Sequence, residues 1–365
     1  MTSVTASRVL TPSGWIGPAR VGLHGPVITS IESVDTSVDR WLVPGFVDLQ
    51  VNGIEDIDVA AASGADWERL DALLAAQGVT TWCPTLVTMP LHHYGRPLAA
   101  IGAASARPQG GRPAIAGAHL EGPFLGDAPG AHPSELIVPV DLEWLSMLPP
   151  HVAVVTLGAE QPLASEATRL LTSAGRLVAI GHSRATEAQF DAVVQAGARL
   201  VTHLFNAMSG LHHRSPGVAA FAITEPGVST SLIADAVHVH PRMLALAFQA
   251  VGADRAVLVT DSVAWRAGTA GVIGLTLAGG APRLPDGTLA GSALTMDAAV
   301  RNCVAAGVPA EHAIQAASRN PARLLGLSDR GTISVGQRAD LVALSPELEI
   351  EQVWASGVAT PILSR

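Results

Sequence analysis

Short apolar runs alternate with segments of helical periodicity through the middle of the chain. Runs this short and this apolar fit parallel strands buried on both faces, and the amphipathic segments between them fit helices that cover such a sheet. The apolar runs fall at residues 46–50, 80–84, 114–121, 152–157, 177–180, 200–203, 230–234 and 256–260. Eight strands with intervening helices are what a (β/α)8 barrel requires. The pattern therefore predicts an α/β fold with a TIM-like barrel at its centre.

Residues near two of the helical segments indicate where those helices begin and end. After the first strand, Ser63 is available as an N-cap and Gly78 is placed to terminate the helix. After the fifth strand, Thr186 and Gln189 have the spacing of a capping box. The Gly- and Pro-rich stretch 268–291 predicts a loop or hairpin over the barrel rather than a linker.

Both ends of the chain differ in pattern from the middle. Residues 1–43 carry short β-like pieces separated by Gly and Pro, and residues 331–365 have the same turn-rich strand character. We therefore expect 1–43 and 331–365 to build one small β-sandwich domain, and 44–330 to build the barrel. Periodicity does not show which of the terminal strands pair.

Composition narrows the class of protein. Of the 365 residues, 48% are hydrophobic and 15% are charged, which is typical of a globular chain. The net charge of -9 and the lack of a Lys/Arg run argue against nucleic acid or an anionic membrane as a partner. Two cysteines without a C-x-x-C pair do not make a disulfide framework or a zinc ribbon. No signal peptide or membrane-spanning run is visible, so we expect a cytoplasmic protein.

Polar residues stand at the ends of the predicted strands, and in a barrel these ends converge on one face. Ionised Glu121 is costly to bury unless it is paired or bound to a metal, and for Glu121 alone a salt bridge is the simpler explanation. With His182 and His203 it forms a carboxylate and imidazole set that suits a catalytic divalent metal. Asp261 closes the eighth strand, where it could act as general base toward metal-bound water or merely form a cap or salt bridge.

Nine short motifs occur in an order that is known from one enzyme family. They are PGFVDLQVNG (44–53), HLEGPF (119–124), GAHP (130–133), GHS (181–183), THLFNAM (202–208), DAVH (235–238), LVTD (258–261), GTLAGS (287–292) and ADLV (339–342). In these motifs the chain resembles the N-acetylglucosamine-6-phosphate deacetylases of the amidohydrolase superfamily, over nearly its whole length. The resemblance implies a metal-dependent hydrolase of the acetamide of N-acetylglucosamine 6-phosphate. It also implies Glu121, His182 and His203 as the metal ligands and Asp261 as the catalytic acid/base.

The first strand departs from the pattern of many amidohydrolases. Where those enzymes carry an H-x-H pair that holds a second metal, this chain has Gln50 and Asn52. Because amides are poorer metal ligands than imidazoles, we expect one divalent metal per chain. Two imidazoles and a carboxylate suit zinc first, with iron, manganese and cobalt as alternatives. His119 is expected to be a supporting or packing residue, because the family pattern carries the chemistry on Glu121.

The same resemblance implies which residues hold the phosphosugar. Asn206 and Ala207 resemble contacts on the phosphate side, and Arg214 resembles a phosphate-binding arginine that by analogy reaches across a homodimer interface. For Arg214 alone, an exposed loop charge is the simpler explanation. His132 and His238 are implied to contact sugar or phosphate, and Ala131 is a further implied substrate contact. The residues implied to line the pocket near the acetyl group are Leu289, Ala290 and Gly291.

Two departures from the family pattern bear on the choice of substrate. Pro129 stands in a loop that usually carries a basic residue, and Trp265 and Arg266 follow Asp261 where small residues are usual. Because both places would lie at a lid, two alternatives stay open. One is an amidohydrolase that acts on another N-acyl amino sugar or a cyclic amide. The other is a catalytically silent sugar-phosphate-binding protein.

Two weaker motifs are set aside. Residues 181–185 nearly match the nucleophile elbow of serine hydrolases, but the final glycine and a matching triad are missing. Gly268, Gly271 and Gly274 are too widely spaced for a dinucleotide-binding fingerprint.

Overall fold

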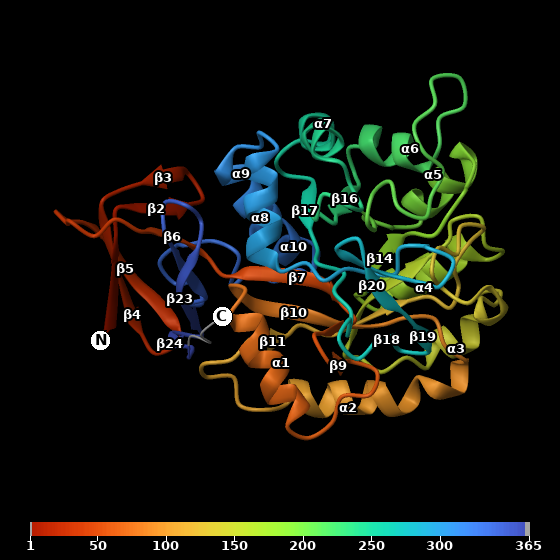
Figure 1. Cartoon of the computed structure of the whole chain (residues 1–365), viewed down its shortest axis with the longest axis horizontal. Coiled ribbons are helices and arrows are strands. Elements are labelled where there is room, and N and C mark those ends of the chain that lie inside the picture. Colours follow the sequence, from red (N-terminus) through yellow and green to blue (C-terminus); the bar gives the residue numbers. More distant parts are fainter. Residues whose placement is uncertain (1, 362–365) are drawn as a thin grey trace.

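The centre of the molecule is a barrel of parallel strands (Figure 1). The computed structural model describes residues 2–361. The barrel strands are β7 (Phe46–Val51), β10 (Val79–Leu86), β12 (Ala118–Glu121), β13 (Val152–Leu157), β14 (Leu177–Ile180), β15 (Leu200–Val201), β16 (Ser229–Leu232) and β17 (Ala256–Leu258). Each pairs in parallel with the next, and a parallel bridge from Val51 to Ser262 returns the chain beyond β17 to β7. Within the described residues, the predicted barrel is confirmed.

The third predicted strand is in fact two strands. Between β11 (Ala114–Ile115) and β12 lies Gly117, whose φ of 144° suits glycine. A Cβ atom there would lie 2.6 Å from the Cβ of Ala153, so a side chain would push β12 away from β13. This close approach lets β12 pair with β13 and end on Glu121 at the barrel mouth.

Helices cover the outside of the barrel (Figure 1). They are α1 (Asp66–Ala75), α2 (Gly95–Ser105), α3 (Leu142–Ser146), α4 (Ala164–Ser173), α5 (Glu187–Gln195), α6 (Val218–Thr224), α7 (Pro241–Val251), α8 (Met296–Ala305), α9 (Ala310–Ala317) and α10 (Arg319–Leu324), with short 3-10 helices at Leu91–His93 and Ser134–Leu136. Among residues 2–361, no helix has the length and apolar character needed to cross a membrane.

The helix-end predictions have mixed outcomes. The capping box is confirmed: the Thr186 hydroxyl accepts the Gln189 backbone N–H at 3.4 Å, and the Gln189 side chain accepts that of Thr186 at 2.9 Å. Gly78, at φ 81°, follows the end of α1 as predicted. The prediction for Ser63 is wrong, because α1 begins without a side-chain cap and the Ser63 backbone N–H donates to Asp66 instead.

Strands from both ends of the chain lie together beside the barrel (Figure 1). One sheet has the order β1-β4-β5 and the other the order β24-β23-β22-β6-β2-β3. Their bounds are β1 (Thr2–Ala6), β2 (Arg8–Thr11), β3 (Gly14–Ile16), β4 (Ala19–His24), β5 (Val27–Ser33), β6 (Trp41–Pro44), β22 (Leu341–Leu344), β23 (Ile350–Ala355) and β24 (Val358–Ala359). Val21 of β4, Leu42 of β6 and Leu341 of β22 share one buried apolar cluster, so both termini contribute to this β domain. Its boundaries at 43/44 and 330/331 stay a prediction.

Two hairpins follow β17 and lie by the barrel mouth. The strands β18 (Thr269–Ala270) and β19 (Ile273–Gly274) pair antiparallel, as do β20 (Thr276–Ala278) and β21 (Ala281–Arg283). A further small pair, β8 (Gly53–Ile54) and β9 (Ile57–Asp58), follows β7. The hairpins bury a separate apolar cluster, which we call the hairpin cluster: Val87, Val263, Ala270, Ile273, Leu275 and Ala290. The predicted hairpin character of 268–291 is therefore present.

A buried carboxyl group links the first barrel strand, β7, to the chain that follows the last one, β17. The Oδ2 atom of Asp48, on β7, accepts the Thr260 hydroxyl at 2.6 Å, and its Oδ1 accepts the Gln50 backbone N–H at 3.1 Å. The Asp261 backbone N–H then donates to the Gln50 carbonyl at 3.0 Å. Burial raises the pKa of Asp48 to about 7, against hydrogen bonds from Thr260 and Gln50 that lower it. We call this junction of β7 with residues 260–262 the barrel seam.

The seam makes stability depend on pH in a direction that can be measured. The folded pKa of Asp48, about 7, is above the 3.8 of an unperturbed aspartate. The folded protein is therefore stabilised by the protonated Asp48 carboxyl. This contribution to the free energy of unfolding is fully present below about pH 4 and is lost as the pH rises through about 7. We expect the Tm of Asp48→Asn minus that of the parent to be larger at pH 8.5 than at pH 5. Both are measured in an Asp261→Asn background, which removes the raised-pKa carboxyl that lies at the same seam. A Tm difference that is the same at both pH values contradicts the assignment.

Candidate active site

The predicted catalytic side chains come from four strand ends at the barrel mouth. Glu121 is the last residue of β12, whereas His182, His203 and Asp261 follow β14, β15 and β17 with φ angles of 49°, 30° and 49°. Non-glycine residues in this left-handed region cost about 1 to 3 kcal/mol each and are typical of functional sites. Here the local contacts hold them: the carbonyl of His182 accepts the Gly126 N–H at 2.9 Å, and the backbone N–H of His203 donates to the Ser231 hydroxyl at 2.8 Å.

Glu121, His182 and His203 bring their ligand atoms to one point. The Oε1 atom of Glu121 lies 3.2 Å from Nε2 of His182 and 3.0 Å from Nε2 of His203, and the two Nε2 atoms are 3.1 Å apart. All three side chains are buried. The sequence prediction that these residues meet is therefore consistent with the geometry.

The protonation of this cluster fits a cation. Nδ1 of His182 lies 3.2 Å from the carbonyl oxygens of Ala128 and Pro129, so Nδ1 carries the hydrogen and the Nε2 lone pair faces the Glu121 carboxylate. Burial lowers the pKa of His182, which favours the neutral ring. For Glu121, burial raises the pKa, but the contacts with the His132, His182 and His203 rings outweigh it and hold the pKa well below its usual range. An ionised carboxylate beside neutral imidazole lone pairs is the donor set that a divalent metal requires.

His132 also lies against Glu121. Its Nε2 atom is 3.6 Å from Oε2 of Glu121, and its Nδ1 is 2.8 Å from the Thr88 hydroxyl. Glu121, His132 and His182 place their ligand atoms within 4.8 Å of one another, which is an alternative metal triad. The contact of His203 with Glu121 is the shorter one, so distance favours His203 as the third ligand and leaves His132 beside it.

The amides of the first strand hold Asp261 in place. Its Oδ1 atom accepts the side-chain N–H groups of Gln50 at 3.1 Å and Asn52 at 2.7 Å. Gln50 also donates to Glu121 at 2.9 Å and accepts the Thr202 hydroxyl at 2.9 Å, so one amide joins the predicted metal ligand to the predicted base. Burial, and next the charge of Glu121, raise the pKa of Asp261 to about 8. In the absence of a cation, Asp261 therefore favours its neutral form at pH 7.

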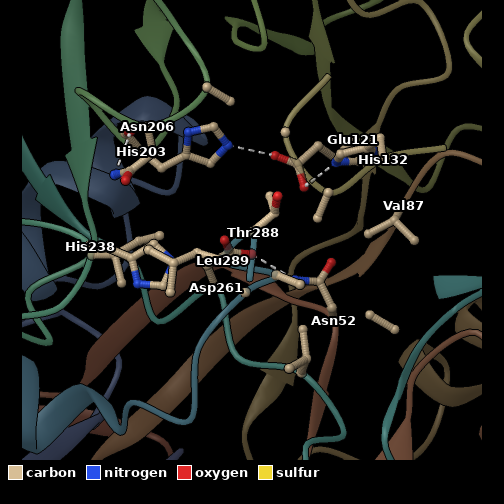
Figure 2. A pocket seen from close by; sticks show the side chains of 18 of the residues that line it. Asn52, Val87, Glu121, His132, His203, Asn206, His238, Asp261, Thr288 and Leu289 are labelled. Carbon is tan, nitrogen blue, oxygen red and sulfur yellow. Dashed lines mark hydrogen bonds and ion pairs between the residues drawn. The ribbon is translucent and has the colours of Figure 1, made fainter. Parts of the chain in front are cut away.

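A cavity of about 290 Å³ opens above these residues, and Figure 2 shows the side chains that line it. Its lining includes nearly every residue that the sequence predicted as a substrate contact: Ala131, His132, Asn206, Ala207, His238, Leu289, Ala290 and Gly291. His238 is oriented by Asp235, whose Oδ2 lies 2.7 Å from its Nδ1. His119 is not part of the lining and instead contacts the Leu49 carbonyl and the Thr156 hydroxyl, in keeping with a supporting role.

Three residues that the sequence singled out lie outside this cavity. Arg214 is exposed on the loop before α6, outside the cavity lining, and its Nη1 contacts His213 at 2.8 Å. Trp265 packs on the hairpin cluster, and Arg266 pairs with Glu55 at 3.1 Å, so neither lines the cavity. Sequence reasoning missed other apolar lining residues, among them Val87, Ala270 and Ile273. No sequence signal distinguishes these aliphatic side chains from those of the core.

Known proteins resemble this chain over most of its length. Residues 41–360 match the model of the family described as "Amidohydrolase family". The chain belongs to the amidohydrolase family. An N-acetylgalactosamine-6-phosphate deacetylase of Escherichia coli O157:H7 is 36% identical over 96% of this chain and 97% of its own length. An N-acetylglucosamine-6-phosphate deacetylase of Danio rerio is 38% identical over 87% of this chain and 84% of its own length.

Solved structures of other amidohydrolases have the same fold. The N-acetylglucosamine-6-phosphate deacetylase of Thermotoga maritima superposes with a TM-score of 0.92 at 30% identity, and both chains are covered completely. A D267A mutant of the Mycobacterium smegmatis enzyme, solved in complex with N-acetyl-D-glucosamine-6-phosphate, has a TM-score of 0.90 at 30% identity and covers 100% of this chain and 99% of its own. The predicted barrel with an attached β domain is thus the fold of amidohydrolases of known structure.

Proposed function

We propose that this amidohydrolase hydrolyses the acetamide of N-acetylglucosamine 6-phosphate to glucosamine 6-phosphate and acetate. The observation that carries the proposal is the convergence of Glu121, His182 and His203 beside Asp261 at the mouth of an amidohydrolase barrel. The relatives and solved structures named for this reaction support the substrate. One divalent metal per chain, which we propose to be zinc, would be held by Glu121, His182 and His203.

Each residue of the site has a defined part in the proposed reaction. A bound divalent cation supplies a Lewis acid for the amide carbonyl and lowers the pKa of water to about 7. Asp261 takes a proton from the attacking water and later gives it to the departing amine nitrogen, which balances the hydrolysis. Gln50 and Asn52 hold Oδ1 of Asp261, which keeps the carboxylate aimed at the reacting atoms. His132 and His238, which line the cavity, would contact the substrate.

An acetate-release assay tests the proposal directly. Protein loaded with one equivalent of metal is given N-acetylglucosamine 6-phosphate, N-acetylgalactosamine 6-phosphate and unphosphorylated N-acetylglucosamine, and metal content is measured on the same sample. We expect the first sugar to be turned over fastest. Faster release from the galactosamine compound would favour a second candidate function, which the full-length match to an N-acetylgalactosamine-6-phosphate deacetylase supports. No turnover of any sugar by metal-loaded protein would favour the silent binding protein.

Arg214 is proposed to bind the substrate phosphate of a partner subunit in a homodimer. Its place on an exposed loop, outside the cavity of its own chain, supports this arrangement. We expect Arg214→Ala to raise the KM for the phosphosugar about 10-fold or more, because a bidentate guanidinium contact to phosphate is lost. The exposed Arg184 provides the matched control, and Arg184→Ala should leave KM unchanged. An unchanged KM in Arg214→Ala makes the phosphate role untenable.

Mixed dimers distinguish action across the interface from action within one chain. Arg214→Ala and Asp261→Asn subunits are unfolded, mixed and refolded together. If Arg214 serves the partner's site, a mixed dimer has one site with both an intact Asp261 and an intact arginine from the other subunit. The assay uses a phosphosugar concentration that saturates the parent enzyme but lies below the KM of Arg214→Ala. Under that condition we expect the mixed dimers to be much more active than either variant alone. No gain on mixing assigns Arg214 to its own chain.

A further inference from the structure

One wall of the cavity is apolar and comes from the hairpin cluster. Val87 follows β10, and Ala270 and Ile273 face each other across the β18–β19 hairpin. All three line the cavity and are at most 8% exposed. In Figure 2, Val87 lies on the opposite side of the cavity from Asn206 and His238, with Glu121 and Asp261 between the two sides. The cavity therefore has Asn206 and His238 at one end and an aliphatic wall beside His132 at the other, which we call the apolar end, with the proposed reaction centre between them.

Specific contacts hold the β18–β19 hairpin against Val87. Asp58, at the end of β9, accepts the Gly271 backbone N–H on Oδ2 at 2.7 Å and the Ala60 N–H on Oδ1 at 2.9 Å. Gly271 has a φ of 59°, and a Cβ atom on it would lie 2.9 Å from Cγ2 of Val87. The turn of the hairpin thus packs its backbone directly onto Val87, and Asp58 holds it there. The positions of Ala270 and Ile273 at the cavity follow from this anchor.

The chemistry of an amide assigns a role to the apolar end. The carbonyl carbon of the substrate amide has two substituents, the nitrogen that leads to the sugar and the carbon of the acyl group. If the phosphosugar extends toward Asn206, the acyl group must extend the other way, toward Val87. We propose that Ala270 and Ile273 form an acyl compartment with Val87 and determine how long an N-acyl group the enzyme accepts. This inference rests on the proposed function and adds its specificity-determining residues.

The inference is tested by comparing acyl groups on one sugar. N-formyl, N-acetyl, N-propionyl and N-butyryl derivatives of the amino-sugar 6-phosphate that gives the faster acetate release are assayed with the metal-loaded full chain. Ile273→Ala enlarges the compartment, and we expect it to raise the butyryl-to-acetyl ratio of kcat/KM about 10-fold, since one methylene in an apolar pocket changes kcat/KM at least that much. Ala270→Leu fills the compartment and should lower the propionyl-to-acetyl ratio by a similar factor. The exposed Val272, in the turn of the same hairpin, provides the control Val272→Ala, which should leave both ratios unchanged.

The outcomes separate this inference from the proposed function. Normal acetate release with both ratios within about two-fold of the parent in Ile273→Ala and Ala270→Leu overturns the acyl compartment alone. A parent enzyme that hydrolyses none of the four derivatives overturns the proposed function and the compartment with it. Should Ile273→Ala not fold, Ile273→Val removes a single methyl group from the same wall and is expected to change the ratio in the same direction. A change of ratio in Val272→Ala as large as in Ile273→Ala also overturns the assignment.

Discussion

Replacement of Asp261 by Asn is expected to lower kcat for acetate release by about 1,000-fold. General acid–base groups contribute about 100- to 10,000-fold to catalysis, and the amide of asparagine cannot take the proton from water or return it to the amine. The substitution preserves the size of the side chain, so metal content and substrate affinity should change little. Because the variant turns over so slowly, its substrate Kd can be measured by calorimetry and compared with the parent KM.

The neighbouring Asp48 provides a matched control for this experiment. It is a second buried carboxyl at the barrel seam, but its contacts are with Thr260 and Gln50, and it does not line the cavity. Asp48→Asn should therefore keep most of the parent kcat. Equal activity of Asp261→Asn and the parent would show that another group moves the proton. A loss in Asp48→Asn as large as that in Asp261→Asn would assign the defect to the shape of the seam.

Replacement of His203 by Ala is expected to abolish metal binding, whereas His132→Ala should retain about one metal per chain. The prediction follows from the distances, because Nε2 of His203 is 3.0 Å from a Glu121 oxygen while Nε2 of His132 is 3.6 Å from the other. His132→Ala should still lower kcat/KM, by about 100-fold, if its ring contacts the substrate. Metal content after gel filtration, measured by mass spectrometry, provides the test.

Loss of metal in His132→Ala but not in His203→Ala would identify Glu121, His132 and His182 as the metal ligands. Loss of metal in both variants would indicate a site with four protein ligands. His119→Gln provides the control, because His119 is a buried histidine two residues before Glu121 that contacts Leu49 and Thr156 instead of the cluster. It should keep the full metal content, with whatever loss of stability the change brings.

The sequence was sufficient for the barrel and for the polar part of the site. Buried parallel strands leave apolar runs that no other element explains, and the side chain at each strand end is marked by its polarity, as at Glu121, His182 and Asp261. The same reasoning selected His203, but it could not show that His132, which comes from a loop, also lies against Glu121. Both are buried histidines near one carboxylate, and only three-dimensional distances rank them.

Of the apolar end of the site, the family resemblance pointed to Ala290, but the wall made by Val87, Ala270 and Ile273 could not be predicted. Val87, Ala270 and Ile273 are aliphatic residues in a protein rich in them, and what distinguishes them is which surface they face. The Gly-rich spacing at Gly268 and Gly271 indicated a turn, but the docking of that turn on Val87 through Asp58 depends on contacts between segments far apart in sequence. The N-cap prediction for Ser63 was wrong for a related reason. Ser63 precedes the N-cap position, Ala65, and its backbone N–H donates to the Asp66 side chain.

The barrel seam has a consequence for the order in which the active site is assembled. A ribosome releases the chain from the amino end, so Glu121, His182 and His203 are all present well before Asp261 is made. Asp261 is positioned by Gln50 and Asn52 of the first strand, and it reaches them only when the chain beyond the last strand returns to β7. Glu121, His182 and His203 therefore exist in the chain before the barrel is complete, but closing the ring is what brings Asp261 to them. For this chain, closure of the barrel and completion of the candidate site are the same step.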